Sequence, residues 1–169
     1  NEKVSEIAKK IKLLILDVDG VLTDGGIYFD DNGVEQKKFD SQDGLGIKLL
    51  QLSGIEVAVI TARSTKSVAH RLKGLGVEHY YHGILDKSIA LEKLIKKLSI
   101  DPSESAYVGD DVIDLPVMTR VALPIAVANA QESVKDHALM VTEKSGGNGA
   151  VREVCNFLLK SQDKYDALV

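Results

Sequence analysis

Short apolar runs alternate with amphipathic segments along most of the chain. Runs bounded by Gly, Asp or Pro predict buried strands at 12–16, 56–61, 78–81, 105–109 and 124–128. Between them, apolar residues recur at helical spacing over 44–54, 67–76 and 88–98. In the first helix we expect Leu45, Leu49 and Leu52 to form the buried face. This alternation predicts an α/β fold, with a three-layer, Rossmann-like parallel sheet and helices on both faces.

Residues 25–39 (GGIYFDDNGVEQKKF) break this alternation. Two short strand-like pieces flank Asp31, Asn32 and Gly33, a combination typical of a tight turn. We therefore predict a β-hairpin inserted after the first strand. No repeat, linker or low-complexity stretch interrupts the rest. Residues 1–169 are interpreted as a single domain that ends in a C-terminal tail at about 160–169.

Composition narrows the class of protein. A net charge of -4 argues against a general nucleic-acid or anionic-membrane surface. The single cysteine, Cys155, lies in an apolar helical pattern and predicts a packing residue in a reducing compartment. Residues 1–12 contain no apolar signal-peptide core, and no run approaches a membrane span, so we expect a cytoplasmic protein. The histidines show no metal-ligand spacing and are interpreted as surface or structural residues: His70, His79, His82 and His137.

Polar side chains follow the predicted strands at the points where these strands end. In chain order they are Asp17, Asp19, Thr61, Arg63, Lys87, Asp110, Asp111 and Asp114. In open parallel sheets, ligands bind beyond the carboxyl ends of the strands, which share one edge. The sequence therefore predicts a site at this edge that combines carboxylates, one hydroxyl and cationic groups.

That set of groups suits phosphoryl transfer. Clustered carboxylates repel each other unless a cation lies among them, and hard oxygen ligands open to water suit Mg²⁺. A lysine and a threonine hydroxyl can hold the non-bridging oxygens of a phosphoryl group. One aspartate of the pair can attack phosphorus, and the other can act as general acid and base.

Each feature alone has a plainer interpretation. Aspartates at strand ends often form turns or cap helices, and Thr61 is a possible helix cap. Lys87 alone would be a solvated residue in the first turn of a helix. A two-component receiver domain also uses acidic residues, Thr and Lys, but its phosphorylated aspartate lies on a later strand. The third predicted strand, 78–81, ends without an aspartate.

Two segments and two single residues together resemble the four motifs of the haloacid dehalogenase-like phosphatases. DVDGVLTD (17–24) resembles the first motif, Thr61 the second, Lys87 the third and GDDVID (109–114) the fourth. The resemblance implies that Asp17 is the nucleophile and Asp19 the general acid and base, with Thr61 and Lys87 completing the catalytic set. It implies a Mg²⁺ site made by the following groups: Asp17, the backbone carbonyl of Asp19, and Asp110, supported by Asp111 and Asp114.

The gaps between these motifs are short. Residues 20–60 separate Asp19 from Thr61, and residues 62–86 separate Thr61 from Lys87. The hairpin and one helix occupy most of the first gap. Neither gap holds a folded cap domain, so we expect either a macromolecular substrate or a lid supplied by neighbouring subunits.

Within this superfamily the chain resembles the 3-deoxy-D-manno-octulosonate 8-phosphate phosphatases. The segments that carry the likeness are 13–25, 43–48, 106–118 and 146–155. The resemblance implies a small sugar-phosphate substrate of lipopolysaccharide synthesis, and a homotetramer whose hairpins complete neighbouring active sites. It implies substrate contacts from Asp19, Asp40, Ser41, Gln42, Asp43, Gly44, Lys48, Arg63, Arg71 and Lys87. Lys48 departs from the pattern, because relatives can carry arginine there.

Several alternatives remain open from sequence. Arg63 and Arg71 fit the solvated polar face of a helix, and 40–44 fits a helix entry capped by Asp40 or Ser41. Arg152 lies either in a simple helix start or in a segment that reaches a neighbour's site. The rival substrate is a nine-carbon ulosonate 9-phosphate. The rival class is a phosphorylatable signalling module without turnover, and a phosphomutase would need a lid that excludes water.

Overall fold

Six parallel strands form the central sheet of the computed structural model, which describes residues 1–169. The strands are β1 (Leu13–Leu16), β4 (Glu56–Ile60), β5 (His79–Tyr81), β6 (Ser105–Gly109), β7 (Leu123–Ala126) and β8 (Met140–Val141). Their spatial order is β5-β4-β1-β6-β7-β8, and every neighbouring pair is parallel. The chain therefore builds outward from β1 on one side and then returns to build the other, as in Rossmann-like sheets. The predicted fold class is confirmed.

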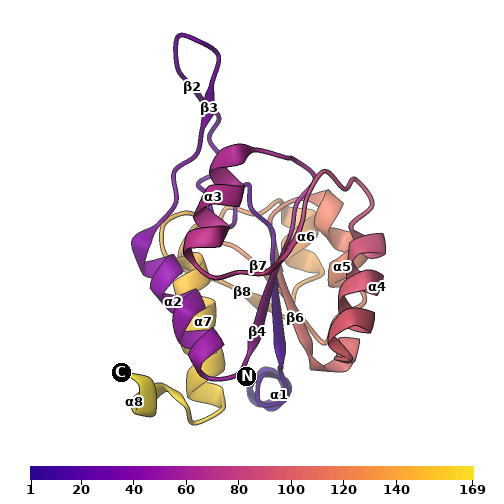
Figure 1. Cartoon of the computed structure of the whole chain (residues 1–169). Coiled ribbons are helices and arrows are strands. Elements are labelled where there is room, and N and C mark those ends of the chain that lie inside the picture. Colours follow the sequence, from indigo (N-terminus) through magenta and orange to yellow (C-terminus); the bar gives the residue numbers. More distant parts are fainter.

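Helices cover both faces of the sheet. They are α1 (Glu2–Ala8), α2 (Ser41–Leu52), α3 (Lys66–Gly74), α4 (Lys87–Leu98), α5 (Leu115–Met118), α6 (Glu132–Asp136), α7 (Ala150–Ser161) and α8 (Tyr165–Leu168), with short 3₁₀ turns η1 (Pro102–Glu104) and η2 (Val112–Asp114). Figure 1 shows α2 and α7 side by side on one flank, and α4 with α5 on the other. No helix has the length and apolar character needed to cross a lipid bilayer.

The predicted hairpin projects from the body of the molecule (Figure 1). Its strands, β2 (Tyr28–Phe29) and β3 (Glu35–Gln36), are antiparallel. The Asp30 carboxylate accepts hydrogen bonds from the N–H groups of Asn32 and Val34, both at 2.9 Å. Gly33 has a φ of 75°, which an L side chain rarely adopts, so the turn chemistry explains where the hairpin reverses.

The buried face of α2 agrees with the predicted one only at Leu49, which is buried. Leu45 and Leu52 are 50% and 74% exposed, whereas Ile47 and Leu50 are fully buried. The reason lies in α7, which packs closely where α2 has Gly46. A Cβ atom at Gly46 would lie 3.1 Å from Cβ of Cys155, so a residue without a side chain sets the contact face. Leucine spacing alone could not reveal this.

Several short elements were not predicted. They are α1, α5, α6, α8 and β8. The α1 helix is charged, and Val4 and Ala8 are its buried residues. Within the predicted C-terminal tail, at about 160–169, α7 continues to Ser161 and the short helix α8 follows. Gln162 anchors this end by donating to the carbonyl oxygens of Ala8 and Ile11, at 3.0 and 2.8 Å.

Candidate active site

The carboxyl ends of β1, β4 and β6 surround one cavity of about 270 Å³. Its lining comprises Asp17, Asp19, Gly25, Ile27, Thr61, Ala62, Arg63, Asp110, Asp111 and Ile113. The sheet is built in opposite directions on the two sides of β1, and such switch points leave a crevice at the strand ends. The expected convergence of the strand-end residues is therefore observed for six of those predicted.

Lys87 lies beneath this cavity and is completely buried. Its Nζ atom is 2.9 Å from Oδ1 of Asp17, 2.7 Å from Oδ1 of Asp114 and 3.1 Å from the hydroxyl of Tyr107. Burial opposes the ammonium charge, but the two carboxylates outweigh it and raise the pKa of Lys87. The plainer interpretation of Lys87 as a solvated residue is wrong.

Asp114 is fully buried and uses both carboxylate oxygens in hydrogen bonds. Oδ1 accepts from Lys87 and from the hydroxyl of Tyr107. Oδ2 accepts from the backbone N–H groups of Asp110 and Asp111, at 2.9 and 3.2 Å. Asp114 thus holds both Lys87 and the loop that carries Asp110, which is the geometry of a supporting group.

The carboxylates of Asp17, Asp110 and Asp114 form a potential cation site. One oxygen from each lies within 4.8 Å of the others. Burial, with repulsion from Asp114, raises the pKa of Asp17 to about 7. Burial, with repulsion from Asp17 and Asp114, raises the pKa of Asp110 to about 9. When ionised, three carboxylates beside the Lys87 ammonium leave a net charge that a divalent cation neutralises, so the donor set fits Mg²⁺.

Gly20 is required by the contact between the first and fourth motifs. Its φ is 83°, and a Cβ atom there would lie 2.0 Å from Oδ2 of Asp110. Both the backbone conformation and the absence of a side chain therefore let Asp110 approach Asp17.

A second loop, 145–149, packs against the same turn. The Asn129 side chain donates to the Gly20 carbonyl oxygen at 3.1 Å and accepts from the Gly146 N–H at 2.7 Å. The Gly147 N–H donates to the carbonyl of Val21 at 3.1 Å. This glycine-rich segment thus braces the first motif of its own chain.

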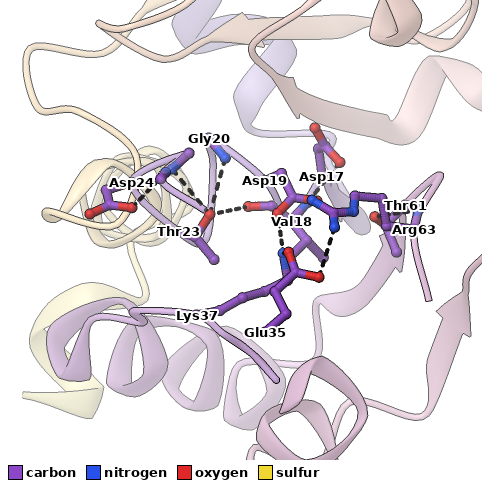
Figure 2. A network of polar contacts seen from close by, with 12 residues as sticks. Asp17, Val18, Asp19, Gly20, Thr23, Asp24, Glu35, Lys37, Thr61 and Arg63 are labelled. Atoms are coloured by element: carbon purple, nitrogen blue, oxygen red, sulfur yellow. Dashed lines mark hydrogen bonds and ion pairs between the residues drawn. The ribbon is translucent and has the colours of Figure 1, made fainter. Parts of the chain in front are cut away.

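Two hairpin residues that sequence reasoning missed reach the site. Figure 2 shows Lys37 between Asp19 and Glu35, with Glu35 also meeting Arg63. Nζ of Lys37 is 2.5 Å from Oδ1 of Asp19, and its side chain is 2% exposed. Glu35 and Lys37 are two positions apart, so they share one face of the hairpin. That spacing is the sequence signal that could have revealed them.

Thr61 and Arg63 follow β4 as predicted. Thr61 is buried, and its N–H donates to the Tyr81 carbonyl oxygen at 2.9 Å, which fixes it against β5. Arg63 lies in the turn before α3, which begins at Lys66, so its assignment to a helix face is wrong. Arg63 instead lines the cavity, and its guanidinium contacts Glu35 at 2.7 Å.

The remaining predicted substrate residues form a separate group. Asp40 is the N-cap of α2, accepting from the Asp43 N–H at 2.9 Å. Gly44 and Arg71 help to line a second, very small hollow with both aspartates, and Lys48 is exposed on α2. Ser41 and Gln42 are exposed in the first turn of the same helix. None of these residues lines the cavity at Asp17 within one chain.

Arg152 bonds within its own chain. Its backbone N–H donates to Oδ1 of the buried Asp43 at 2.9 Å, so Asp43 caps the start of α7. Its guanidinium donates to the Gln42 carbonyl oxygen at 3.2 Å. Asp111 has a comparable local role, because its carboxylate accepts from the Val112 N–H at the start of η2. Cys155 is a fully buried thiol, as expected.

A larger hollow of about 660 Å³ lies near α1, where the sheet begins. Lysines and short ion pairs line it, with Lys12 pairing with Glu104 at 2.6 Å. It has no cluster of convergent carboxylates with raised pKa values. Chemistry rather than size therefore identifies the smaller cavity as the candidate active site.

Comparisons with known proteins agree with this geometry. A family model described as haloacid dehalogenase-like hydrolase matches residues 81–154. The 3-deoxy-D-manno-octulosonate 8-phosphate phosphatase of Escherichia coli K12 is 52% identical over 159 residues, which cover 94% of this chain and 85% of the relative.

Two solved structures have closely similar folds. The Yersinia pestis 3-deoxy-D-manno-octulosonate 8-phosphate phosphatase has a TM-score of 0.96 and 46% identity, covering 98% of this chain and 89% of its own. The Moraxella catarrhalis enzyme of the same name, in complex with a magnesium ion, a phosphate ion and KDO, also has a TM-score of 0.96 and 46% identity. That alignment covers 98% of this chain and 95% of the other.

Proposed function

The chain belongs to the 3-deoxy-D-manno-octulosonate 8-phosphate phosphatase family of haloacid dehalogenase-like hydrolases, and on this basis we propose that it releases phosphate from that eight-carbon sugar ester. It is a Mg²⁺-dependent phosphoric monoester hydrolase. The observation that carries the proposal is the cluster of the buried Asp17, Lys87 and Asp114 with the partly buried Asp110, at the switch point of the sheet. The M. catarrhalis relative, which holds KDO, magnesium and phosphate, supports the choice of the eight-carbon substrate over the nine-carbon one.

In the first half-reaction, a carboxylate oxygen of Asp17 attacks phosphorus. The new bond joins Asp17 to the phosphoryl group, while the bond from phosphorus to the C8 oxygen of the sugar breaks. Asp19 gives its proton to that leaving oxygen. Lys87 stabilises the negative charge around Asp17, and the Thr61 hydroxyl orients a phosphoryl oxygen.

In the second half-reaction, water attacks phosphorus and the bond to Asp17 breaks. Asp19 now accepts the proton of the water, which returns it to its starting state. Asp17, the Asp19 carbonyl oxygen and Asp110 would hold Mg²⁺, with Asp114 and Asp111 in support. The bound ion supplies positive charge beside the phosphoryl oxygens.

The substrate is tested by Mg²⁺-dependent phosphate release from a panel of sugar phosphates that includes the eight- and nine-carbon ulosonates. We expect kcat/KM for the eight-carbon ester to exceed the others by at least about tenfold, or about 1.4 kcal/mol in transition-state binding. EDTA should abolish release, and added Mg²⁺ should restore it. Flat, slow activity across the panel would contradict the substrate, and no turnover would favour the signalling-module alternative.

The proposed assembly is a homotetramer whose subunits complete each other's active sites. Four large apolar side chains on the hairpin are 43–62% exposed: Ile27, Tyr28, Phe29 and Val34. Such a patch at the end of a projecting element favours burial against another subunit. Asp40–Gly44 and Arg71 lie away from the cavity of their own chain. In the proposed tetramer they would contact the substrate in the cavity of a neighbouring subunit.

We expect light scattering to give four times the 18.3 kDa mass of one chain. Phe29→Glu should dissociate this assembly and raise KM for the sugar phosphate, because a charge would replace a buried interface residue. Leu52→Glu, which replaces an exposed leucine at the far end of α2, is the matched control and should change neither property. A monomer that retains full kcat/KM would refute the shared-lid proposal.

We also propose a cytoplasmic location for the enzyme. Cys155 is a buried free thiol and the only cysteine in the chain, so nothing in the fold depends on an oxidising compartment.

A further inference from the structure

The hairpin contributes a chain of alternating charges to the rim of the active site (Figure 2). Asp19 meets Lys37 at 2.5 Å, Lys37 meets Oε1 of Glu35 at 3.4 Å, and Oε2 of Glu35 meets Arg63 at 2.7 Å. The two outer residues line the cavity, and the two inner residues come from the hairpin. A single glutamate therefore connects both cations.

Burial divides these four charged residues into a fixed part and a movable part. The Lys37 side chain is 2% exposed and the Glu35 side chain 15% exposed, so the two residues that the hairpin contributes are enclosed. The Arg63 side chain is 42% exposed, and its only ion pair is with Glu35. If Arg63 turned away, Glu35 would still keep Lys37 as a partner. Breaking the Arg63 contact therefore leaves no carboxylate unpaired.

We propose that Glu35 is a specificity-determining residue that occupies Arg63 in the free enzyme and releases it to the carboxylate of the substrate. The proposal rests on the proposed function, in which the substrate carries both a phosphate and a sugar carboxylate. A ligand carboxylate replaces Glu35 at the guanidinium, so one ion pair is exchanged for another.

A sugar phosphate without a carboxylate cannot make this exchange. Glu35 then stays paired with Arg63, so such a ligand neither breaks this ion pair nor gains a new one. Glu35 therefore weakens the binding of ligands whose carboxylate must displace it from Arg63, and leaves ligands without a carboxylate unaffected. This is selection by competition, in which an internal anion sets the threshold that a ligand must exceed.

A positioning role for Glu35 predicts a change in KM in the opposite direction. If Glu35 merely held Arg63 in the correct position for substrate, removing its charge would raise KM for carboxylated substrates. Under the proposal, removing the charge frees Arg63 and lowers KM for those substrates. The direction of the KM change therefore separates the two roles.

The test compares Glu35→Gln with the unchanged enzyme and with Asp31→Asn, an exposed carboxylate on the same hairpin. For the eight-carbon ulosonate phosphate we expect Glu35→Gln to lower KM about two- to fivefold, the size expected for a partly exposed ion pair, with kcat nearly unchanged. For p-nitrophenyl phosphate, which has no carboxylate, KM should change less than about twofold. Asp31→Asn should alter neither value.

A double-mutant cycle sharpens the result. In an Arg63→Gln background, Glu35→Gln should no longer lower KM, because the residue it competes for is absent. A rise in KM for the ulosonate, an equal fall for both substrates, or no change in either would overturn the proposal. Melting curves for each variant check that it is folded.

Failure of the proposed function would look different. If the unchanged enzyme hydrolyses p-nitrophenyl phosphate but not the ulosonate ester, only the substrate assignment fails. The pair 6-phosphogluconate and glucose 6-phosphate, which differ in a carboxylate, then tests Glu35 in the same way. If the unchanged enzyme hydrolyses no phosphate ester, the proposed function is overturned, and the Glu35 proposal with it.

Discussion

Asp17→Asn is expected to reduce phosphate release by at least about 10³-fold, because the amide lacks the carboxylate that attacks phosphorus. The substituted side chain keeps the size of the original, so the loss should appear in kcat rather than in assembly. Single-turnover measurement should detect no phosphoenzyme with Asp17→Asn, whereas the unchanged enzyme forms one. Turnover within about tenfold of the unchanged enzyme would contradict the assignment of the nucleophile.

The stability of the same variant provides an internal check. Burial raises the pKa of Asp17 to about 7 in the folded protein, against an ordinary value of 3.8. Because the folded-state pKa is the higher one, ionising Asp17 costs stability as pH rises from about 4 through 7. Asparagine cannot ionise, so without metal the variant should melt no lower than the unchanged enzyme at pH 8. Asp136→Asn, at an exposed position, is the control and should leave activity unchanged.

Lys87→Met is expected to cause the largest loss of stability. It removes the only cation that contacts Asp17 and Asp114, and so leaves two buried carboxylates uncompensated. Breaking a buried pair in this way typically costs about 3–5 kcal/mol. In a protein of this length, each kcal/mol lowers Tm by roughly 2–4 °C, so thermal melting of the metal-free enzyme measures it directly. Phosphate release should fall by about 10²-fold or more, since a cation beside the phosphoryl group is lost.

Two further variants decide whether charge is the cause. Lys93→Met changes an exposed lysine on the same helix and should shift the free energy of unfolding by less than about 0.5 kcal/mol. Adding Asp114→Asn to Lys87→Met removes one uncompensated charge and should recover part of the lost stability, without restoring activity. If Lys87→Met cost less than about 1 kcal/mol, the buried ion cluster would not be the structural centre described above.

Five of the six strands and most of the reactive groups could be predicted from the amino-acid sequence. Buried parallel strands are apolar on both faces, so β1, β4 and β6 stand out as short runs bounded by polar residues. Ligands bind where such strands end, so the sequence assigns Asp17, Thr61 and the 109–114 segment to one edge of the sheet. The Asp31–Gly33 turn was equally local, since it depends on the conformational preferences of adjacent residues.

Short or amphipathic elements were less predictable because their formation depends on contacts elsewhere. The α2 helix carries leucines around much of its surface. Its buried face is determined by α7, which packs against Gly46. Two-residue β8 and charged α1 have too little pattern to be recognised, yet each is stabilised by an existing layer. Asp43 was predicted as a substrate contact or as part of a helix entry, but it caps α7, more than a hundred positions away.

The pairing of the reactive groups depends on contacts between residues far apart in the sequence. Lys87 has the sequence position of a solvated residue in the first turn of a helix. Its burial against Asp17 and Asp114 arises from the packing of α4 and η2 under the strand ends. Lys37 and Glu35 belong to a projecting hairpin that is distant from Arg63 in sequence, and the fold brings them to Asp19 and Arg63. Motifs specify the chemistry of an isolated side chain. Its charge partners and exposure, which set its reactivity, depend on residues distant in sequence that the fold brings near.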